Sequence, residues 1–592
     1  MAKSSERCSP PPGGMGDLDS LSARGIQSKS FGARLLVQAQ GVFLIAAGFL
    51  IILAPSAPFT KELGVCESGA VRDVLAGNII LPRFVPGPIV HVPPLYWWMA
   101  AICVKALGWS ELALRLPSLI AAALTCAIVF AWSSRTLGPS VGLWSAAALL
   151  LCHFFLDAAR QPRMDSMLAL FVTAAAVSLE RAIAARAQAK PHATWYFIAA
   201  AIAIGLGTLT KGILGIVLPG LVVALFLLIR GRLAELFHFD MAATFAVGLA
   251  IGLAWFLAGY ELGGRPFLEW QVRMNLWSRF IPAGAGGAGY CAHPFWYFAP
   301  QILSGFLPWS LYLPAFALAA WPAEGRRLPE PAVYALCWFA ALFIFFSSSH
   351  GKCLIYILPA FPPLAILTGW AIVQVQKGFD TRRWVRQLFK AGSAIIAIGT
   401  ALMVIAAMLV IGYGMPAKIA LRLHPTDHRF LELLVRQAFN PPLLLWAGFS
   451  LMGAALAVRG LLRAIPALEI YGTLMIAAAS GWFWFAVMNP GLAQGETLKT
   501  FARQAAASVP ADARFGHFGL SDCELNFYSP RPLEPISQFS CIEHAAAGQY
   551  IIIREQDFNA IPSMQRVCYV TQLAAIPNDS IGPRLLIRRT RP

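Results

Sequence analysis

Two carboxylates lie in polar segments beside long apolar runs of the chain. Glu67 lies in ESGAVRD, which follows the first apolar run, and Asp165 lies in ARQPRMDSML, directly before a later one. A carboxylate at the depth of a membrane interface can accept a proton from a hydroxyl group and so act as a general base. We therefore treat Glu67 and Asp165 as candidate catalytic residues.

Basic residues also lie at the ends of apolar runs that are expected to face the outer side of a membrane. Loops on that side are usually poor in basic residues. An Arg side chain can bind two phosphate oxygens at once, and a Lys side chain supplies a point charge. A ring of these residues at membrane depth therefore predicts a site for a phosphate or pyrophosphate head group. Its members are Arg160, Arg163, Lys211, Arg273, Arg279, His293 and Lys352.

Each of these residues also has a simpler structural explanation. An Arg or Lys at the end of a span can extend its charged group to the interface, and Asp165 could cap the helix that follows it. Glu67 could be a solvated loop residue. The Gly-rich run 283–289 could be a flexible loop as well as a phosphate-binding one. Taken singly, none of these residues decides the function.

The elements that position these residues are membrane spans. The chain has 592 residues, of which 58% are hydrophobic and 13% charged, and its mean hydropathy is +0.64. A soluble protein carries about 25% charged residues, whereas runs of roughly 20 apolar residues recur here. The composition predicts a polytopic α-helical membrane protein with about thirteen spans. The spans are expected to begin near Leu36, Leu116, Val141, Ser166, Trp195, Ile213, Met241, Phe295, Ala332, Leu354, Ala391, Pro442 and Pro466.

The net charge of +17 is explained by membrane topology rather than by binding to nucleic acid. Basic residues cluster in short segments between the apolar runs, as expected for loops on the cytoplasmic side. With the N-terminus inside, this pattern holds only if the aromatic segment 95–107 does not cross the bilayer. We therefore expect residues 95–107 to form an interfacial helix in the first outer loop.

Three regions follow from this pattern. Residues 1–35 are rich in Ser, Pro and Gly and are expected to be a disordered cytoplasmic start. Residues 36–490 are expected to form the transmembrane domain, with the first outer loop at 55–115. Short apolar runs in residues 491–592 predict the strands of a small extracytoplasmic α/β domain.

The eleven Cys residues follow no metal-binding spacing, and most lie in apolar spans. Cys523, Cys541 and Cys568 lie in the polar C-terminal region instead. If that region is extracytoplasmic, one pair among these three could form a disulfide, and the sequence does not choose which.

The order of the polar segments resembles that of a known enzyme family. The segments are ESG, RDVLAGN and VPPLYWW in the first loop, then ARQPRMDSML, LTKG, WSRF with HPFWYF, and GKCLIYILPAFP. Over roughly residues 36–375 they resemble the polyprenyl-phosphate-sugar-dependent transferases of the GT-C superfamily, in particular the lipid A aminoarabinose transferases and the protein O-mannosyltransferase-like family. The resemblance implies about thirteen spans, an interfacial helix in the first loop and an outer C-terminal domain.

The resemblance also implies roles for individual residues. Glu67 falls in the acidic pair of the family's first loop, in which Cys66 replaces the first acid, and Asp165 matches the second acidic position. Glu62 is the alternative to Glu67, because the spacing to the Ala-Gly that follows is about one turn short. The implied substrate-binding residues are Arg163, Lys211, Arg279, His293, Lys352 and Tyr356.

One departure from the family affects the phosphate site. Many relatives have Glu-Lys before the two prolines of the first loop, where this chain has His91-Val92. A phosphate-binding Lys is thus missing, and His91, Arg83 or Lys105 could replace it. We include Arg83 and His91 among the expected substrate-binding residues.

By this resemblance the chain is expected to be an inverting glycosyltransferase of the cell inner membrane with a periplasmic active site. The expected partners are a polyprenyl-phosphate-linked sugar donor and a lipid A-type or other envelope acceptor, and neither a metal nor another cofactor is expected. A protein O-mannosyltransferase-like or polysaccharide-modifying transferase is the first alternative. A flippase or transporter of lipid-linked sugars is the second, although we find no internal repeat of the kind common in transporters.

Overall fold

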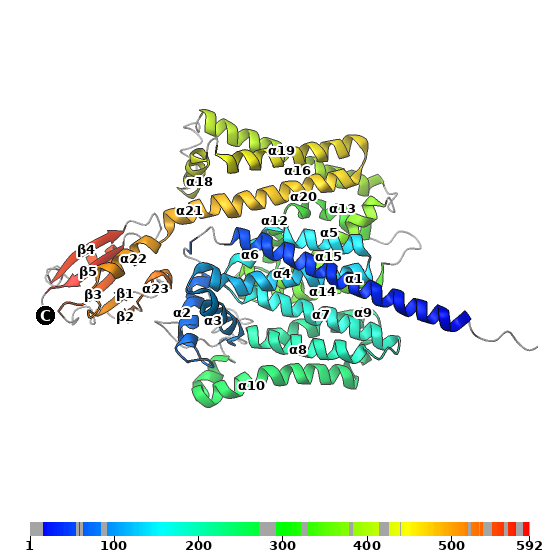
Figure 1. Cartoon of the computed structure of the whole chain (residues 1–592), viewed down its shortest axis with the longest axis horizontal. Coiled ribbons are helices and arrows are strands. Elements are labelled where there is room, and N and C mark those ends of the chain that lie inside the picture. The colour runs from blue at the N-terminus through cyan, green and yellow to red at the C-terminus, as the bar shows by residue number, and fades with distance from the viewer. Residues whose placement is uncertain are drawn as a thin grey trace, which may run out of the picture.

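The computed structural model is a bundle of long helices with a small domain containing a β-sheet at one end (Figure 1). The elements of the first loop, α2 and α3, lie between the bundle and this domain (Figure 1). The structure describes residues 16–54, 58–59, 63–83, 92–271, 292–320, 328–377, 383–413, 425–437, 440–518, 523–531, 533–536, 547–561, 566, 568–575 and 584–590.

Within the described residues, 10 helices are long and apolar enough to cross a bilayer, or up to 12 spans if each of two bent helix pairs is one span. The shorter apolar helix α9 adds one more candidate, so each predicted starting point falls at or beside an apolar helix. The long spans are α1 (Gly16–Leu53), α4 (Glu111–Thr136), α7 (Asp165–Ala187), α8 (Ala193–Lys211), α10 (Phe239–Trp270), α14 (Glu330–Ser348), η7 (Leu354–Ala360) with α15 (Phe361–Gln376), α16 (Arg383–Tyr413), α19 (Pro441–Arg463) and α20 (Pro466–Phe483). The bent pairs are α5 (Pro139–Leu150) with α6 (His153–Arg160), and η5 (Phe295–Tyr297) and α12 (Phe298–Gly305) with η6 (Trp309–Tyr312) and α13 (Leu313–Ala320); α9 is Leu214–Ile229.

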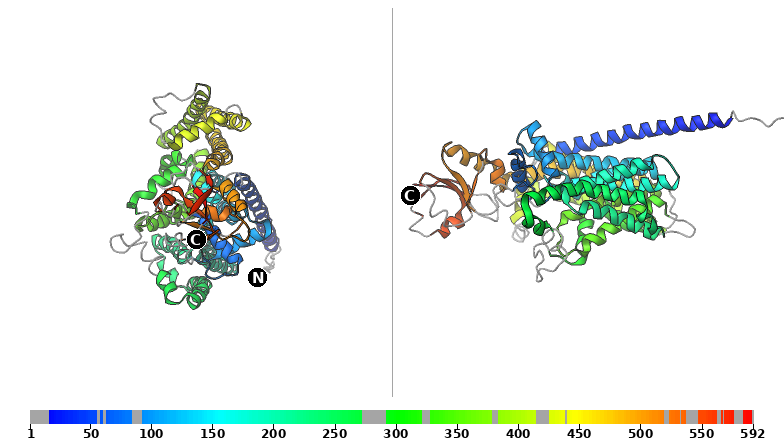
Figure 2. Two further views of the ribbon diagram at one scale, coloured as in Figure 1. Left: turned by 90° about the vertical axis from the view of Figure 1, so that its left-hand side faces the viewer. Right: turned by 90° about the horizontal axis from the view of Figure 1, so that it is seen from below.

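Helix α1 starts earlier than the sequence predicts. Its apolar part is 32–53, but its helical backbone begins at Gly16, within the region 1–35 that is predicted to be disordered. Residues 16–31 include Leu, Ala, Arg, Gln and Lys, whose helix propensity offsets that of the Ser and Gly among them. In Figure 2 this part of α1 extends beyond the other helices, at the end opposite the C-terminal domain.

Small residues pack the centre of the bundle around α7. Ala123 of α4 and Ala175 and Ala176 of α7 are completely buried, and α7 contacts both α4 and α8. Small side chains allow helix backbones to approach closely in an apolar environment, where dispersion contacts hold helices together. This packing fixes the first residue of α7, Asp165, and the last residue of α8, Lys211.

The first loop contains the short helices η1 (Leu63–Cys66), α2 (Glu67–Leu75) and α3 (Leu95–Leu107). Helix α3 has the bounds that the sequence predicts for the interfacial helix. Its Tyr96 and Trp97 are buried against the protein, whereas Ile102 and Leu107 are more than half exposed. A helix with one buried face and an exposed apolar face is typical of an element that lies along a membrane surface.

The C-terminal domain contains a five-stranded mixed sheet in the order β2-β1-β3-β5-β4. Strand β1 pairs in parallel with β2 and β3, and β5 pairs antiparallel with β3 and β4. The predicted small α/β domain is therefore present. Its elements are α22 (Lys499–Ser508), β1 (Phe515–Phe518), α23 (Cys523–Tyr528), β2 (Glu534–Ile536), β3 (Tyr550–Arg554), α25 (Glu555–Ala560), β4 (Tyr569–Ala575) and β5 (Arg584–Arg589).

A disulfide ties the C-terminal domain to the first loop. It joins Cys523 of α23 to Cys66 of η1, whereas the sequence left open a disulfide between one pair of Cys523, Cys541 and Cys568. Cys568 is a free thiol, and Cys541 lies outside the described residues. Cys523 pairs outside its own region because the C-terminal domain and the first loop share one hydrophobic core, which brings together residues 457 positions apart.

Candidate active site

Glu67 is the first residue of α2 and faces α3. The indole Nε1 of Trp97 donates a hydrogen bond of 2.6 Å to Glu67 Oε2, and Trp97 itself is completely buried. A buried Trp requires a partner for its N–H group, and a carboxylate is a strong acceptor. The Trp97 contact therefore fixes the position of the Glu67 carboxylate, which is not a freely solvated loop residue.

Gly64 allows the segment before α2 to lie against the turn that precedes α7. A Cβ atom at this position would come within 3.0 Å of Arg163 Cγ and of the Pro162 carbonyl oxygen. Only a residue without a side chain fits such an approach without displacing its neighbours. The close approach brings the start of α2 next to the residues around Asp165.

Asp165 is the first residue of α7, and its side chain is only 5% exposed. It forms an ion pair with Lys211 Nζ and a second one of 3.2 Å with Arg163 Nε. The N-cap residue of α7 is Met164, which has no capping side chain, so Asp165 does not serve as the N-cap. Two cations satisfy this buried carboxylate, as a charge in such a place requires.

Lys211 is placed by the tight connection between α8 and α9. Helix α8 ends at Lys211, and Gly212 follows with a φ of 64°, a conformation that glycine adopts readily. The Lys211 ammonium group lies 4.7 Å from the centroid of the Tyr356 ring, in cation–π contact. Lys211 thus joins Asp165 to η7, the segment that carries Tyr356.

Glu67, Arg163, Asp165 and Lys211 form one electrostatic group, which we call the acid cluster. Burial raises the pKa of Glu67 to about 7, and the Trp97 hydrogen bond opposes this effect. Arg163 and Lys211 also lower the pKa of Glu67, and Asp165 raises it. A carboxylate with a pKa near 7 can exchange a proton at neutral pH, as a general base must.

A second cationic site lies at Lys352, on the loop between α14 and η7. Lys352 is 3% exposed, and its ammonium group donates to the carbonyl oxygens of His293, at 2.8 Å, and Ser349. The chain segments are also joined by a β-bridge between Ala292 and Gly351. Desolvation lowers the pKa of Lys352. In the described part of the chain no carboxylate pairs with it, so its positive charge is compensated only by carbonyl dipoles.

The other predicted residues have mixed positions. His293 is exposed, and its ring stacks on Tyr297 with the centroids 4.0 Å apart. The Arg83 side chain is exposed, while its backbone N–H donates to Asp73 Oδ2 at 2.7 Å. His91 and Arg279, like the alternative base Glu62, lie outside the described residues.

Two residues that position the site were not among the predicted ones. Trp97 fixes Glu67, and Asp73 of α2 holds the loop that follows by accepting hydrogen bonds from Arg83 and Asn78. Both lie inside the segments RDVLAGN and VPPLYWW that carry the family resemblance. Among the described residues, no group of three or more His, Cys, Asp or Glu side chains is arranged to hold a metal ion.

Comparison with known proteins places this geometry in context. Residues 91–258 match the family model described as dolichyl-phosphate-mannose-protein mannosyltransferase. An undecaprenyl phosphate-alpha-4-amino-4-deoxy-L-arabinose arabinosyl transferase of Pseudomonas aeruginosa (strain LESB58) is 30% identical over 338 residues, which are 57% of this chain. The corresponding protein of Enterobacter sp. (strain 638) is 28% identical over 333 residues, 55% of this chain. In both cases the match spans 58% of the relative's own length.

Solved structures cover much more of the chain. The crystal structure of ArnT from Cupriavidus metallidurans bound to undecaprenyl phosphate covers 93% of this chain and 97% of its own, with a TM-score of 0.71 and 19% identity. The apo structure of the same protein gives a TM-score of 0.69. The chain has the fold of ArnT. The predicted fold class, a GT-C type membrane bundle with a small C-terminal domain, is confirmed, and so is the resemblance to the aminoarabinose transferases.

The matched family region, 91–258, includes α3, the start of α7 and the end of α8, and therefore Trp97, Asp165 and Lys211. Glu67 and Lys352 lie outside this region and are brought to the same end of the bundle by η1–α2 and by η7, which packs on α7.

Proposed function

We propose that the chain is a glycosyltransferase that moves a sugar from a polyprenyl-phosphate donor to a lipid A-type or other envelope glycolipid. The arabinosyl transferases that it resembles are named for an undecaprenyl phosphate-linked sugar, and the ArnT structure holds undecaprenyl phosphate. The observation that carries the proposal is the acid cluster. A carboxylate with a pKa of about 7 lies beside a buried Asp–Lys pair, at the end of the bundle where the short helix α3 exposes apolar side chains.

In this proposal Glu67 is the general base. Its pKa matches neutral pH, whereas the Asp165 carboxylate is held by Arg163 and Lys211. Glu67 takes the proton of the acceptor hydroxyl while that oxygen forms a bond to the anomeric carbon of the donor sugar. Asp165 keeps Lys211 in place, and its negative charge stabilises the positive charge that develops at the anomeric carbon.

The leaving group is the polyprenyl phosphate. The bond between the anomeric carbon and the phosphate oxygen breaks, and its electron pair remains on that oxygen. Lys352 is the strongest candidate to stabilise this charge, because it is buried and paired only with carbonyl oxygens in the described part of the chain. Arg279, His293 and Tyr356 are proposed to complete the phosphate site. A direct displacement of this kind inverts the anomeric configuration.

We place the site on the periplasmic face of the inner membrane, with the N-terminus in the cytoplasm and residues 491–592 as the outer domain. The Cys66–Cys523 disulfide supports this orientation, because disulfides persist in oxidising compartments. The distribution of basic residues supports it as well.

The decisive experiment incubates the purified protein with radiolabelled polyprenyl-phosphate sugar and an envelope glycolipid extract, and follows the release of polyprenyl phosphate. The wild type should release it and label the glycolipid, whereas the Glu67→Gln variant should not. Unchanged donor with both proteins, together with movement of donor across reconstituted vesicles, would indicate a transporter instead.

A second candidate is transfer to a protein hydroxyl group. It is favoured by the match of residues 91–258 to the mannosyltransferase family model. The two are separated by replacing the glycolipid extract with envelope proteins in the same assay, since the label then moves to a polypeptide only if the acceptor is a protein.

A further inference from the structure

The short helix α23 joins the C-terminal domain to the first loop. It packs against η1 and α2, and its Phe527 is buried among the rings of Phe59, Trp109 and Tyr528. Contacts between aromatic rings stabilise a core beyond the burial of their apolar area. Helix α23 is therefore a fixed point against which the elements of the first loop are held.

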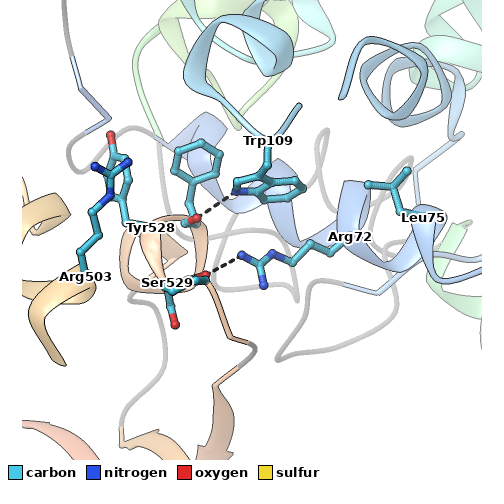
Figure 3. A pocket seen from close by; sticks show the side chains of 8 residues that line it. Arg72, Leu75, Trp109, Arg503, Tyr528 and Ser529 are labelled. Carbon is cyan, nitrogen blue, oxygen red and sulfur yellow. Dashed lines mark hydrogen bonds between the residues drawn. The ribbon is translucent and has the colours of Figure 1, made fainter. Parts of the chain in front are cut away.

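On one side, α23 holds helix α2, whose first residue is Glu67. The disulfide joins Cys523 to Cys66, the residue directly before Glu67. Just after the end of α23, the Ser529 carbonyl oxygen accepts a hydrogen bond of 2.9 Å from the Arg72 guanidinium group (Figure 3). Because Arg72 lies more than one helical turn after Glu67, α2 is attached to α23 at two separate points.

On the other side, α23 holds the turn between α3 and α4. Trp109 Nε1 donates to the Phe527 carbonyl oxygen at 2.9 Å (Figure 3). The Tyr528 hydroxyl group donates to Glu111 Oε1 at 3.2 Å and accepts a hydrogen bond of 2.6 Å from the Phe59 backbone N–H. This hydroxyl group thus uses both its donor and its acceptor capacity on the first loop.

Both partners of the hydrogen bond between Glu67 and Trp97 therefore lie on elements that α23 holds. Glu67 begins α2, and Trp97 belongs to α3, which leads into the turn at Trp109. A hydrogen bond between two helices keeps its length only while the helices keep their separation and angle. Because α23 is attached to α2 and to the end of α3, it fixes that separation.

We infer that α23 positions the catalytic base, and that Tyr528 is a positioning residue of the reaction although it belongs to the C-terminal domain. The inference rests on the proposed function, in which Glu67 is the base. Tyr528 touches neither substrate in this account and acts through Phe59 and Glu111. The C-terminal domain is then part of the framework of the active site.

The test measures the protonation of Glu67 in the full-length protein in detergent, without donor or acceptor. Infrared difference spectra recorded during a pH titration show the carbonyl stretch of each carboxylic acid that forms, and the Glu67 band is the one that the Glu67→Gln variant lacks. In the wild type its midpoint should lie at about 7. The other titratable groups that interact with Glu67 stay unchanged in the variants below, namely Tyr96, Arg163, Asp165 and Lys211.

The matched variants are Tyr528→Phe and Tyr550→Phe, which each remove one hydroxyl group from the C-terminal domain. Both tyrosines are 6% exposed, but the Tyr550 hydroxyl group forms no hydrogen bond with the first loop in the described part of the chain. Tyr528→Phe should admit water beside Glu67 and lower the midpoint by about one pH unit. Its kcat should fall roughly ten-fold with both KM values unchanged. Tyr550→Phe should match the wild type.

A second variant, Trp109→Phe, keeps an aromatic ring but removes the donor to the Phe527 carbonyl oxygen. It should lower the midpoint as well, and it decides the question if Tyr528→Phe does not fold. Equal midpoints in Tyr528→Phe and Tyr550→Phe would overturn the inference. This holds even if Tyr528→Phe has a lower thermal unfolding temperature, because Tyr528 would then stabilise the domain without positioning the base.

The titration and the transfer assay distinguish this inference from the proposed function. If Tyr528→Phe shifts the Glu67 midpoint but no protein turns over donor, the proposed function fails, and α23 still fixes the Glu67 carboxylate. If the wild type transfers the sugar and Tyr528→Phe changes neither the midpoint nor kcat, the proposed function stands and the inference fails.

Discussion

Two lysines, the partly buried Lys211 and the buried Lys352, lie at the same end of the bundle and differ in their partners. Lys211 forms an ion pair with the Asp165 carboxylate, which Arg163 also binds. Lys352 is bound only by the carbonyl oxygens of His293 and Ser349 in the described part of the chain. Both side chains are largely withdrawn from water, so the difference lies in how each charge is compensated.

The difference between the two lysines shows how one end of the bundle can hold both a structural ion pair and a positive charge that attracts an anion. A buried charge needs a partner, and an ion pair such as Lys211–Asp165 is complete without a ligand. Carbonyl dipoles stabilise an ammonium group only in part, so Lys352 retains attraction for an anion. We therefore expect Lys211 to organise the acid cluster and Lys352 to bind the donor phosphate. The following predictions test this difference.

The largest effect is expected for Glu67→Gln. The glutamine carbonyl can still accept the Trp97 hydrogen bond, but the side chain cannot take a proton, so the transfer rate should fall about 10²- to 10⁴-fold. The measurement is release of polyprenyl phosphate under single-turnover conditions. Glu62→Gln is the control, and a loss of activity in that variant alone would identify Glu62 as the base.

A smaller effect, on donor affinity, is expected for Lys352→Met. Loss of one charged hydrogen bond to the phosphate should raise the donor KM about 10- to 100-fold, with the acceptor KM unchanged. Lys352→Met also removes the donor to the His293 and Ser349 carbonyl oxygens, so the KM values are compared below the thermal unfolding temperature measured for the variant. An unchanged donor KM would show that the phosphate lies elsewhere.

Lys211→Met should lower the stability of the protein rather than mainly its affinity for the donor. Removing Lys211 leaves Arg163 as the cation that still pairs with the buried Asp165 in the described part of the chain, so the protein should lose about 1–3 kcal/mol of unfolding free energy. Thermal unfolding in detergent measures the change. Adding Asp165→Asn should restore part of the stability, because the carboxylate that lost its partner is then neutral; additive losses in the double variant would contradict the ion-pair assignment.

The sequence predicts the membrane spans and helix α3 better than it predicts the contacts that position the site. Spans and the helix α3 follow from the length and polarity of apolar runs, which are local properties. The Asp165–Lys211 pair could be expected from two motifs at span ends, but the hydrogen bond from Trp97 that fixes Glu67 depends on the angle between α2 and α3. The Cys66–Cys523 disulfide could not be predicted, because it depends on how the C-terminal domain docks on the first loop.

The pH dependence of the reaction should reveal the state of Glu67. Its pKa is raised to about 7 from 4.5, so the carboxylate is protonated and inactive as a base below that pH. Activity should therefore rise as the pH increases through about 7 and not through 4.5. A profile of kcat/KM against pH for the free enzyme measures this limb. Lys352→Arg should leave the acid limb in place, whereas a limb near pH 4.5 would show that Glu67 is solvated.

The smallest effect is expected for the disulfide. In the double variant Cys66→Ser/Cys523→Ser, α2 is still held by Trp97 and by Arg72, whose guanidinium group donates to the Ser529 carbonyl, so activity should fall only a few-fold. Looser packing of α2 admits water to Glu67, and the burial that raises its pKa is then weaker. The acid limb should therefore move below pH 7 in this variant, and the same shift should follow treatment of the wild type with a reductant. A lower rate without any shift of the limb would mean that the disulfide stabilises the C-terminal domain and does not position Glu67.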